Sequence, residues 1–385
     1  MTGRETLLWG RPSAPEDAPR RSVLHCIRML APFREALPEL GFSTSDLAEG
    51  ERQFYAFVKA LYGEMYGDPA FFLIPEGEYD DYMGTAGERK KTAERRHETD
   101  QKECRLRNRF QQAIRFYTAY LYELGIRAES LENGVLTLSE ASWREARKAV
   151  EWPHLRGGNE PRYQRLHALG LDERCEPGGV YITSREYPKM MYGLWALCAA
   201  PDNKYRYMDY LRLDYRAALR GGPEAAEIYA TLSPERAAAV RTLHEAMAGL
   251  GMRVKIKPLR EITSGSRWKV EYQEHGKCAA GFYAGPDSLT FCLYFGSAGR
   301  VTEISARLWE EKPALGAWLD SKFPERLCKC PSNRRVELGD GPRRICGLSC
   351  RAEIEEPTPG EIENYLSIFT LLRENASAPQ DGEEP

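Results

Sequence analysis

Hydrophobic positions in the first part of the chain recur mostly at helical spacing. This periodicity predicts a helix from about Val23 to Leu40 and a strongly apolar helix from Met190 to Leu197. Between them, shorter runs of apolar residues interrupt the helical pattern and are typical of strands. We therefore predict a mainly helical domain with short strands over residues 23–220.

Two stretches of this domain resemble each other and predict a tandem α-β-α repeat. A Leu-Gly-apolar trio begins at Leu124 and again at Leu169, and such a trio is typical of a helix that ends with glycine just after its last turn. Gly134 and Gly179, 45 residues apart, each precede a short strand and a serine that can begin another helix. Chance use of common helix-capping residues explains the same pattern, so both readings stay open.

The chain breaks at Gly221-Gly222-Pro223, and a different pattern follows the break. Neither a helix nor a strand continues readily through two glycines and a proline, so we place a domain boundary there. Beyond it, apolar and polar residues alternate, which predicts an antiparallel meander with one buried face. We predict an α+β fold, with this meander, several helices and a hairpin bearing cysteines over residues 224–375. Residues 1–22 and 376–385 are polar and are expected to form a mobile leader and a disordered tail.

The C-terminal alternation is clearest in three segments, Trp268-Lys-Val-Glu-Tyr272, Phe282-Tyr283 and Leu289-Thr-Phe-Cys-Leu-Tyr-Phe295. Over about residues 250–300, their order after a helix resembles small α+β modules in uncharacterised bacterial proteins of the YdhG/YjbR type. The resemblance implies a compact domain that binds a ligand or a partner. It assigns no reaction and no role to any single residue.

Four cysteines form two close pairs on either side of a predicted hairpin. One residue separates Cys328 from Cys330, three residues separate Cys346 from Cys350, and a Gly-Asp-Gly turn centred on Asp340 lies between the pairs. Folding at this turn brings both pairs to the open end of the hairpin, where four thiolates form a tetrahedral structural zinc site. Because the first pair is closer in sequence than most zinc-binding pairs, free thiols or a redox-active pair are the alternative.

Cations and aromatic residues alternate through a predicted helix from Tyr205 to Arg220. This alternation is typical of surfaces that hold phosphates while bases stack on aromatic rings. In the other reading the tyrosines belong to the core and the arginines form a solvated face, and Tyr215 in particular falls on the apolar stripe. The candidate nucleic-acid contacts are Lys204, Tyr205, Arg206, Arg212, Arg216 and Arg220.

Composition and charge narrow the class of function. The 385 residues carry a net charge of −3, so a surface for an anionic partner must be local. The chain has no run of about 20 apolar residues to span a membrane, and we expect a cytoplasmic protein whose cysteines stay reduced. Nucleophile-elbow, Walker A and dinucleotide-binding motifs are lacking. We expect a binding or regulatory protein with structural zinc, and the alternative is an enzyme with its pocket between the two domains.

Overall fold

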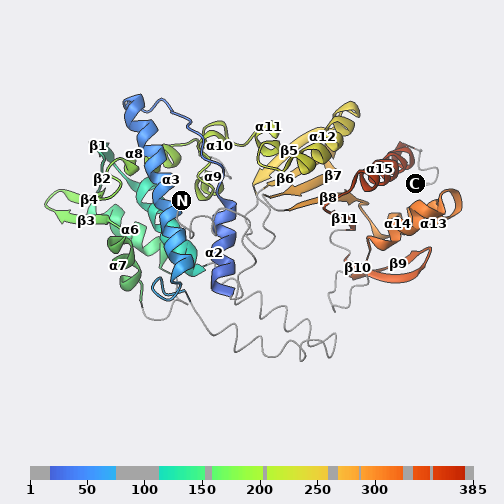
Figure 1. Cartoon of the computed structure of the whole chain (residues 1–385), viewed down its shortest axis with the longest axis horizontal. Helices are drawn as coiled ribbons and strands as arrows, with labels where there is room; N and C mark the ends of the chain where they lie inside the picture. Colours follow the sequence, from blue (N-terminus) through green and yellow to red (C-terminus); the bar gives the residue numbers. More distant parts are fainter. Residues whose placement is uncertain are drawn as a thin grey trace, which may run out of the picture. The chain divides into compact units, whose positions relative to one another are not determined.

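The computed structural model describes residues 18–74, 112–151, 158–202, 206–258, 268–285, 288–323, 333–346 and 350–377. These residues form two compact units, and the chain passes from unit 1 to unit 2 between Pro223 and Glu224 (Figure 1). The break that we placed at Gly221-Gly222-Pro223 lies at this division. Each unit has its own antiparallel sheet and its own hydrophobic core, which confirms the predicted α+β class.

Unit 1 is mainly helical, but its helices begin and end differently from the prediction. The first described helix begins at Ala18, inside the predicted leader, and ends at Met29 instead of Leu40, before Pro32. The helices are α2 (Ala18–Met29), α3 (Thr44–Gly67), a helix over residues 112–127, α6 (Glu140–Val150), α7 (Glu160–Ala168), α8 (Met190–Cys198), α9 (Arg206–Leu211) and α10 (Tyr215–Arg220).

The residues after α2, which were predicted to continue the first helix, are held by a buried carboxylate. Residues 31–39 form no helix or strand, and Glu51 of α3 accepts hydrogen bonds from the backbone N–H groups of Ala36 (2.9 Å) and Leu37 (3.2 Å). Burial raises the pKa of Glu51, although these two hydrogen bonds act in the opposite direction. The segment after α2 is therefore fixed to α3 by polar contacts, which satisfy backbone groups that a helix would have satisfied itself.

The apolar helix α8 packs against its neighbours through glycines. A Cβ atom at Gly193 would lie 2.3 Å from the backbone oxygen of Gly50, and one at Gly50 would lie 2.5 Å from Cβ of Tyr192. A Cβ atom at Gly125 would lie 2.4 Å from Sγ of Cys198. Gly125 is inside the helix over residues 112–127, so its predicted role at a helix end is wrong. Its lack of a side chain instead allows close packing against α8.

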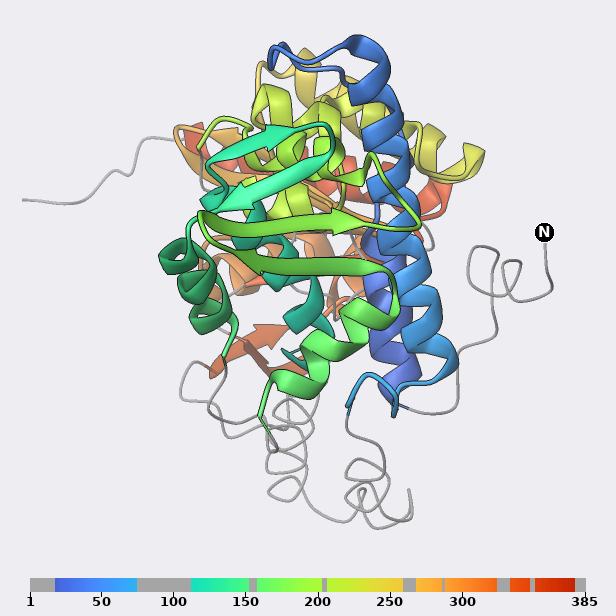
Figure 2. The same ribbon diagram turned by 90° about the vertical axis from the view of Figure 1, so that its left-hand side faces the viewer.

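The four-stranded sheet of unit 1 has a local two-fold axis. Its strands are β1 (Ser130–Glu132), β2 (Val135–Leu138), β3 (Leu171–Glu176) and β4 (Gly179–Ser184), in the order β1-β2-β4-β3 (Figure 2). Each pairing in the first hairpin recurs 44 residues later, so Leu131 opposite Leu136 corresponds to Cys175 opposite Val180. The central strands pair symmetrically about Thr137 and Tyr181.

The two hairpins support the predicted repeat but correct its spacing. Both turns contain a glycine with positive φ, namely Gly134 (79°) and Gly178 (117°). These two glycines are 44 residues apart, so Gly178, and not Gly179, is the equivalent of Gly134. A spacing of 45 would make Leu136, which faces inward, the equivalent of Tyr181, which faces outward, because a one-residue shift reverses the faces of a strand.

Unit 2 contains the predicted antiparallel meander. Its five-stranded sheet has the order β11-β8-β7-β6-β5, so β11 extends the meander beside β8. A tight turn of the meander lies at His275-Gly276, where both residues have positive φ. The strands of the sheet are β5 (Arg253–Pro258), β6 (Trp268–Glu274), β7 (Lys277–Ala284), β8 (Leu289–Tyr294) and β11 (Arg351–Glu355).

Helices and a separate hairpin complete unit 2. Alternate side chains of the five-stranded sheet, among them Tyr272 and Phe291, share one core with Met247 of α12 and Tyr365 of α15. The final helix runs to Ser377, two residues into the predicted tail, and residues 378–385 lie outside the described part. The remaining elements are α11 (Ala225–Tyr229), α12 (Pro234–Gly249), α13 (Ala298–Glu311), α14 (Pro313–Ser321), β9 (Asn333–Leu338), β10 (Gly341–Cys346) and α15 (Pro359–Ser377).

Candidate functional site

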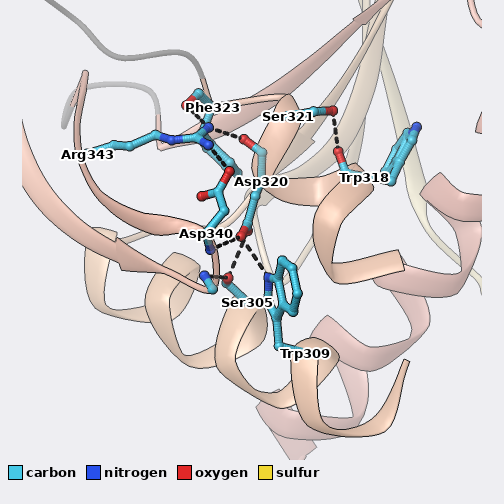
Figure 3. Close-up of polar contacts among 9 residues, drawn as sticks. Ser305, Trp309, Trp318, Asp320, Ser321, Phe323, Asp340 and Arg343 are labelled. Carbon is cyan, nitrogen blue, oxygen red and sulfur yellow. Dashed lines mark hydrogen bonds and ion pairs between the residues drawn. The ribbon is translucent and has the colours of Figure 1, made fainter. Parts of the chain in front are cut away.

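The hairpin between the cysteine pairs is fixed to α13 and α14 through a buried carboxylate. Asp320 accepts hydrogen bonds from Oγ of Ser305 (2.7 Å), Nε1 of Trp309 (2.8 Å) and the backbone N–H of Asp340 (3.3 Å) (Figure 3). Donors from α13 and from the turn of the hairpin therefore converge on one side chain of α14. Because a buried carboxylate with several donors tolerates little displacement, this contact sets the position of the hairpin turn.

Arg343 of β10 makes a second connection, near the segment that contains the first cysteine pair. Its Nη1 donates to the backbone oxygens of Asp320 (2.6 Å) and Phe323 (3.0 Å), and its Nη2 forms an ion pair with Asp340 (Figure 3). Phe323 is the last described residue before Cys328 and Cys330. The start of the cysteine-bearing segment is thereby connected to the hairpin.

Of the four predicted zinc ligands, Cys350 and the backbone of Cys346 lie within the described residues. Cys346 ends β10 opposite Asn333, at the open end of the hairpin. Cys350 is 4% exposed, and its backbone oxygen accepts a hydrogen bond from the N–H of Phe295. Cys328 and Cys330 fall outside the described residues, and only the backbone of Cys346 is described. The zinc site therefore stays a prediction.

The predicted nucleic-acid helix contains a buried ion pair. Arg212 and Asp209 have side chains that are 0% exposed, and Nη2 of Arg212 lies 2.8 Å from Oδ1 of Asp209. Burial lowers the pKa of Arg212 and raises the pKa of Asp209, while the partner of each opposes that shift. A phosphate cannot reach Arg212, so the prediction that this residue contacts nucleic acid is wrong. Tyr215 is buried as well, so its predicted place in the core is confirmed.

The other described candidate contacts in this segment lie on two separate short helices. Nε of Arg206 donates to the hydroxyl of Tyr122 (3.1 Å), and Nε of Arg216 donates to the backbone oxygen of Glu35 (3.1 Å). Arg216 and Arg220 are exposed on α10, whereas Arg206 is on α9, and the chain turns between the two helices. Lys204 and Tyr205 lie outside the described residues.

A basic surface is present on unit 2, on the face of the sheet that points away from the core. Alternate residues of the strands carry five cations against three carboxylates on this face. Two tyrosines lie among these charges. We call this surface the basic sheet face, and it consists of Arg253, Lys255, Lys257, Lys269, Glu271, Tyr283, Tyr294, Arg351, Glu353 and Glu355.

Two lysines of this face share one carboxylate. Nζ of Lys257 lies 2.5 Å from Oε2 of Glu271, and Nζ of Lys269 lies 2.8 Å from Oε1. Burial alone would raise the pKa of Glu271, but the two lysine hydrogen bonds hold it below its usual value. Glu271 is therefore ionised at neutral pH and fixes both ammonium groups, which together still leave one positive charge in excess.

The centre of the basic sheet face combines cations with aromatic rings. Nζ of Lys269 lies 5.5 Å from the ring centre of Tyr283 and 5.6 Å from that of Tyr294. The guanidinium of Arg351 lies 5.5 Å and 6.0 Å from the same two rings and donates to the hydroxyl of Tyr283 (3.1 Å). The side chains of Lys269 and Arg351 are 21% and 27% exposed, so both cations remain accessible from solvent.

Part of this surface was visible in the sequence. The segment Arg253-Val-Lys-Ile-Lys257 alternates cations with apolar residues, and strand periodicity places all three cations on one face. We used the alternation of apolar residues to predict strands and assigned no role to these cations. The contribution of Arg351 had no such signal, because its strand reaches the sheet only through pairing with β8.

Searches against protein-family models, curated proteins and solved structures found no match to the chain. The resemblance to modules of the YdhG/YjbR type therefore stays a prediction. Within the described parts of the chain, no helix has both the length and the apolar character needed to cross a membrane. In the same residues, no group of three or more His, Cys, Asp or Glu side chains is placed to hold a metal ion.

Proposed function

We propose that this chain is a cytoplasmic binding protein that holds nucleic acid on the basic sheet face of unit 2. The observation that carries the proposal is the local excess of cations around two tyrosines in a chain whose net charge is −3. Arginine and lysine side chains bind phosphate and release its counterions, which supplies most of the non-specific affinity for nucleic acid. This face takes the place of residues 204–220, which the sequence predicted as one helix, as the proposed contact surface.

The cations are positioned to meet a chain of phosphates and not a single one. Arg253, Lys255 and Lys257 lie along the edge strand β5, whereas Arg351 lies on the opposite edge strand β11. Neighbouring strands are about 4.8 Å apart, so the two edges are about 19 Å apart. A ligand that uses both edges must carry negative charges separated by a similar distance, as a polynucleotide does.

Neutralising Arg253 and Lys255 together tests this proposal. The double variant Arg253→Gln/Lys255→Gln is expected to bind nucleic acid about tenfold more weakly, because lost phosphate contacts weaken binding and reduce its salt dependence. For each lost contact, the slope of log K against log salt should decrease by about 0.7 for a single strand or 0.9 for a duplex. Fluorescence anisotropy with labelled oligonucleotides over a range of salt concentrations measures both effects.

The matched control removes two exposed cations from unit 1. Lys148→Gln/Arg174→Gln changes the net charge by the same amount and should leave both the affinity and the salt slope unchanged. A wild-type protein that binds neither single-stranded nor duplex oligonucleotides at low salt would rule out the proposed function. Equal losses in the two double variants would assign the effect to net charge and would also contradict the proposal.

We also propose that Cys328, Cys330, Cys346 and Cys350 hold a structural zinc ion. The hairpin supports this, because it places Cys346 at its open end and Asn333 opposite, three residues after Cys330. Thiolates are preferred zinc ligands, and four of them close the coordination shell without a position for substrate. The metal would join the two ends of the hairpin.

Protein purified without added metal is therefore expected to contain about one zinc ion per chain by elemental analysis. Cys350→Ser should lower the zinc content and the melting temperature of unit 2, because metal binding contributes to the folding of such sites. Cys175→Ser, which changes an exposed cysteine of unit 1, should alter neither. The proposal would be refuted if the protein contained no zinc as purified and if a chelator left its melting temperature unchanged.

A further inference from the structure

We infer that the ligand of the basic sheet face is single-stranded nucleic acid, and that its bases stack against Tyr283 and Tyr294. This inference rests on the proposed function and names the class of nucleic acid. The two tyrosines lie on the inner strands β7 and β8, between the cations of β5 and the arginine of β11. A strand that crosses the sheet from one basic edge to the other must pass over them.

The order of charges and rings across the sheet favours a single strand over a duplex. Lys257, Lys269 and Tyr283 occupy neighbouring positions on β5, β6 and β7, because Lys257 pairs with Lys269 and Lys269 pairs with Tyr283. A duplex keeps the faces of its bases inside its own stack and offers phosphates and groove edges. Aromatic side chains at the centre of a sheet are useful only to a ligand whose base faces are accessible.

The cations next to the rings are held in place before a ligand arrives. Glu271 fixes Lys269, and Glu353 accepts a hydrogen bond from Nε of Arg351 (2.7 Å). Each cation therefore stays beside Tyr283 and Tyr294, where it can contact a phosphate while the adjoining base contacts a ring. Side chains that are already ordered lose less entropy on binding, which favours affinity.

Removing the ring of Tyr283 tests the stacking contact. We expect Tyr283→Leu to bind a single-stranded oligonucleotide of about eight nucleotides roughly 5- to 150-fold more weakly, which is the range for loss of one base–aromatic stack. Its salt slope should stay unchanged, because no phosphate contact is removed. Tyr283→Phe keeps the ring and loses only the hydroxyl that accepts from Arg351, so it should bind nearly as tightly as the wild type.

The same experiment compares a fluorescein-labelled single strand of mixed sequence with its duplex, and the single strand should bind at least about tenfold more tightly. Tyr181→Leu, which changes a partly exposed tyrosine of the unit 1 sheet, should have no effect on binding. If Tyr283→Leu does not fold, as judged by its melting curve, Tyr294→Leu and the comparison of single strand with duplex still test the inference.

Several outcomes separate this inference from the proposed function. Equal affinity for single strand and duplex, with Tyr283→Leu unchanged and Arg253→Gln/Lys255→Gln weakened, overturns the inference and leaves the function standing. Full competition by the free mononucleotide AMP at the same concentration as the oligonucleotide also overturns it, since the ligand is then a small nucleotide. Absence of binding to either form of the labelled oligonucleotide overturns both.

Discussion

Arg212→Gln is expected to lower the free energy of unfolding by about 3–5 kcal/mol, because it leaves the carboxylate of Asp209 buried without its charged partner. The two side chains are fully buried in unit 1, so water cannot replace the lost ion pair. Urea unfolding monitored by circular dichroism measures the change.

Arg216→Gln is the matched control for this prediction. Arg216 is four residues further along the chain and exposed, and its substitution should change the stability by about 0.5 kcal/mol or less. The two arginines have the same charge and nearly the same position in the sequence, so a large difference isolates the effect of burial. Equally small effects would show that Arg212 is open to solvent.

Gly193→Ala is expected to destabilise unit 1 by about 3 kcal/mol or more, at the upper end of the cost of overpacking. The added methyl group would lie 2.3 Å from the backbone oxygen of Gly50. The oxygen belongs to the backbone of α3, and the methyl group would be attached directly to the backbone of α8. No rotation of a side chain therefore relieves the clash, and α3 and α8 must separate. That separation would weaken packing along the whole contact between the two helices.

Gly249→Ala is the control, and it is expected to raise the stability where Gly193→Ala lowers it. Gly249 is the last residue of α12, and a Cβ atom there has no other atom within 4 Å. Alanine should therefore raise the stability by about 0.5–1 kcal/mol through its higher helix propensity. Chemical denaturation of both variants tests the contrast, and a stabilising Gly193→Ala would disprove the close contact of α3 with α8.

Local signals predicted much of unit 2. Strand alternation was sufficient to predict the meander, because each hairpin is decided by residues close in sequence. Thr358 and Glu361, three residues apart, cap the start of the last helix, where each side chain accepts a hydrogen bond from the backbone N–H of the other. These features depend on side chains a few residues apart.

Predictions in unit 1 failed where the outcome depended on distant contacts. The sequence pattern predicted one helix over residues 205–220, with Arg212 on the same face as Arg216. The chain instead turns at Leu213, whose φ is positive at 52°, and the turn directs Arg212 inward. Gly125 shows the same limit, because only the packing of α8 distinguishes a glycine at a helix end from one at a close contact.

The candidate binding surface could be predicted only in part. Strand periodicity was enough to place Arg253, Lys255 and Lys257 on one face of β5. Their proximity to Tyr294 and Arg351 depends on the order and register of five strands, which includes the non-sequential pairing of β8 with β11. Sequence patterns indicate which residues share a face of one strand, but they do not fix which strands lie side by side.

The local two-fold axis in the unit 1 sheet is consistent with an origin of the sheet by duplication of one hairpin. Two equal hairpins that pair through equivalent edges form the same isologous contact as a symmetric homodimer. Joining them in one chain raises the effective concentration of each hairpin for the other, so the contact no longer depends on protein concentration. The sheet of unit 1 thus has the form expected from duplication and fusion of a hairpin module, with Thr137 and Tyr181 at the local two-fold axis.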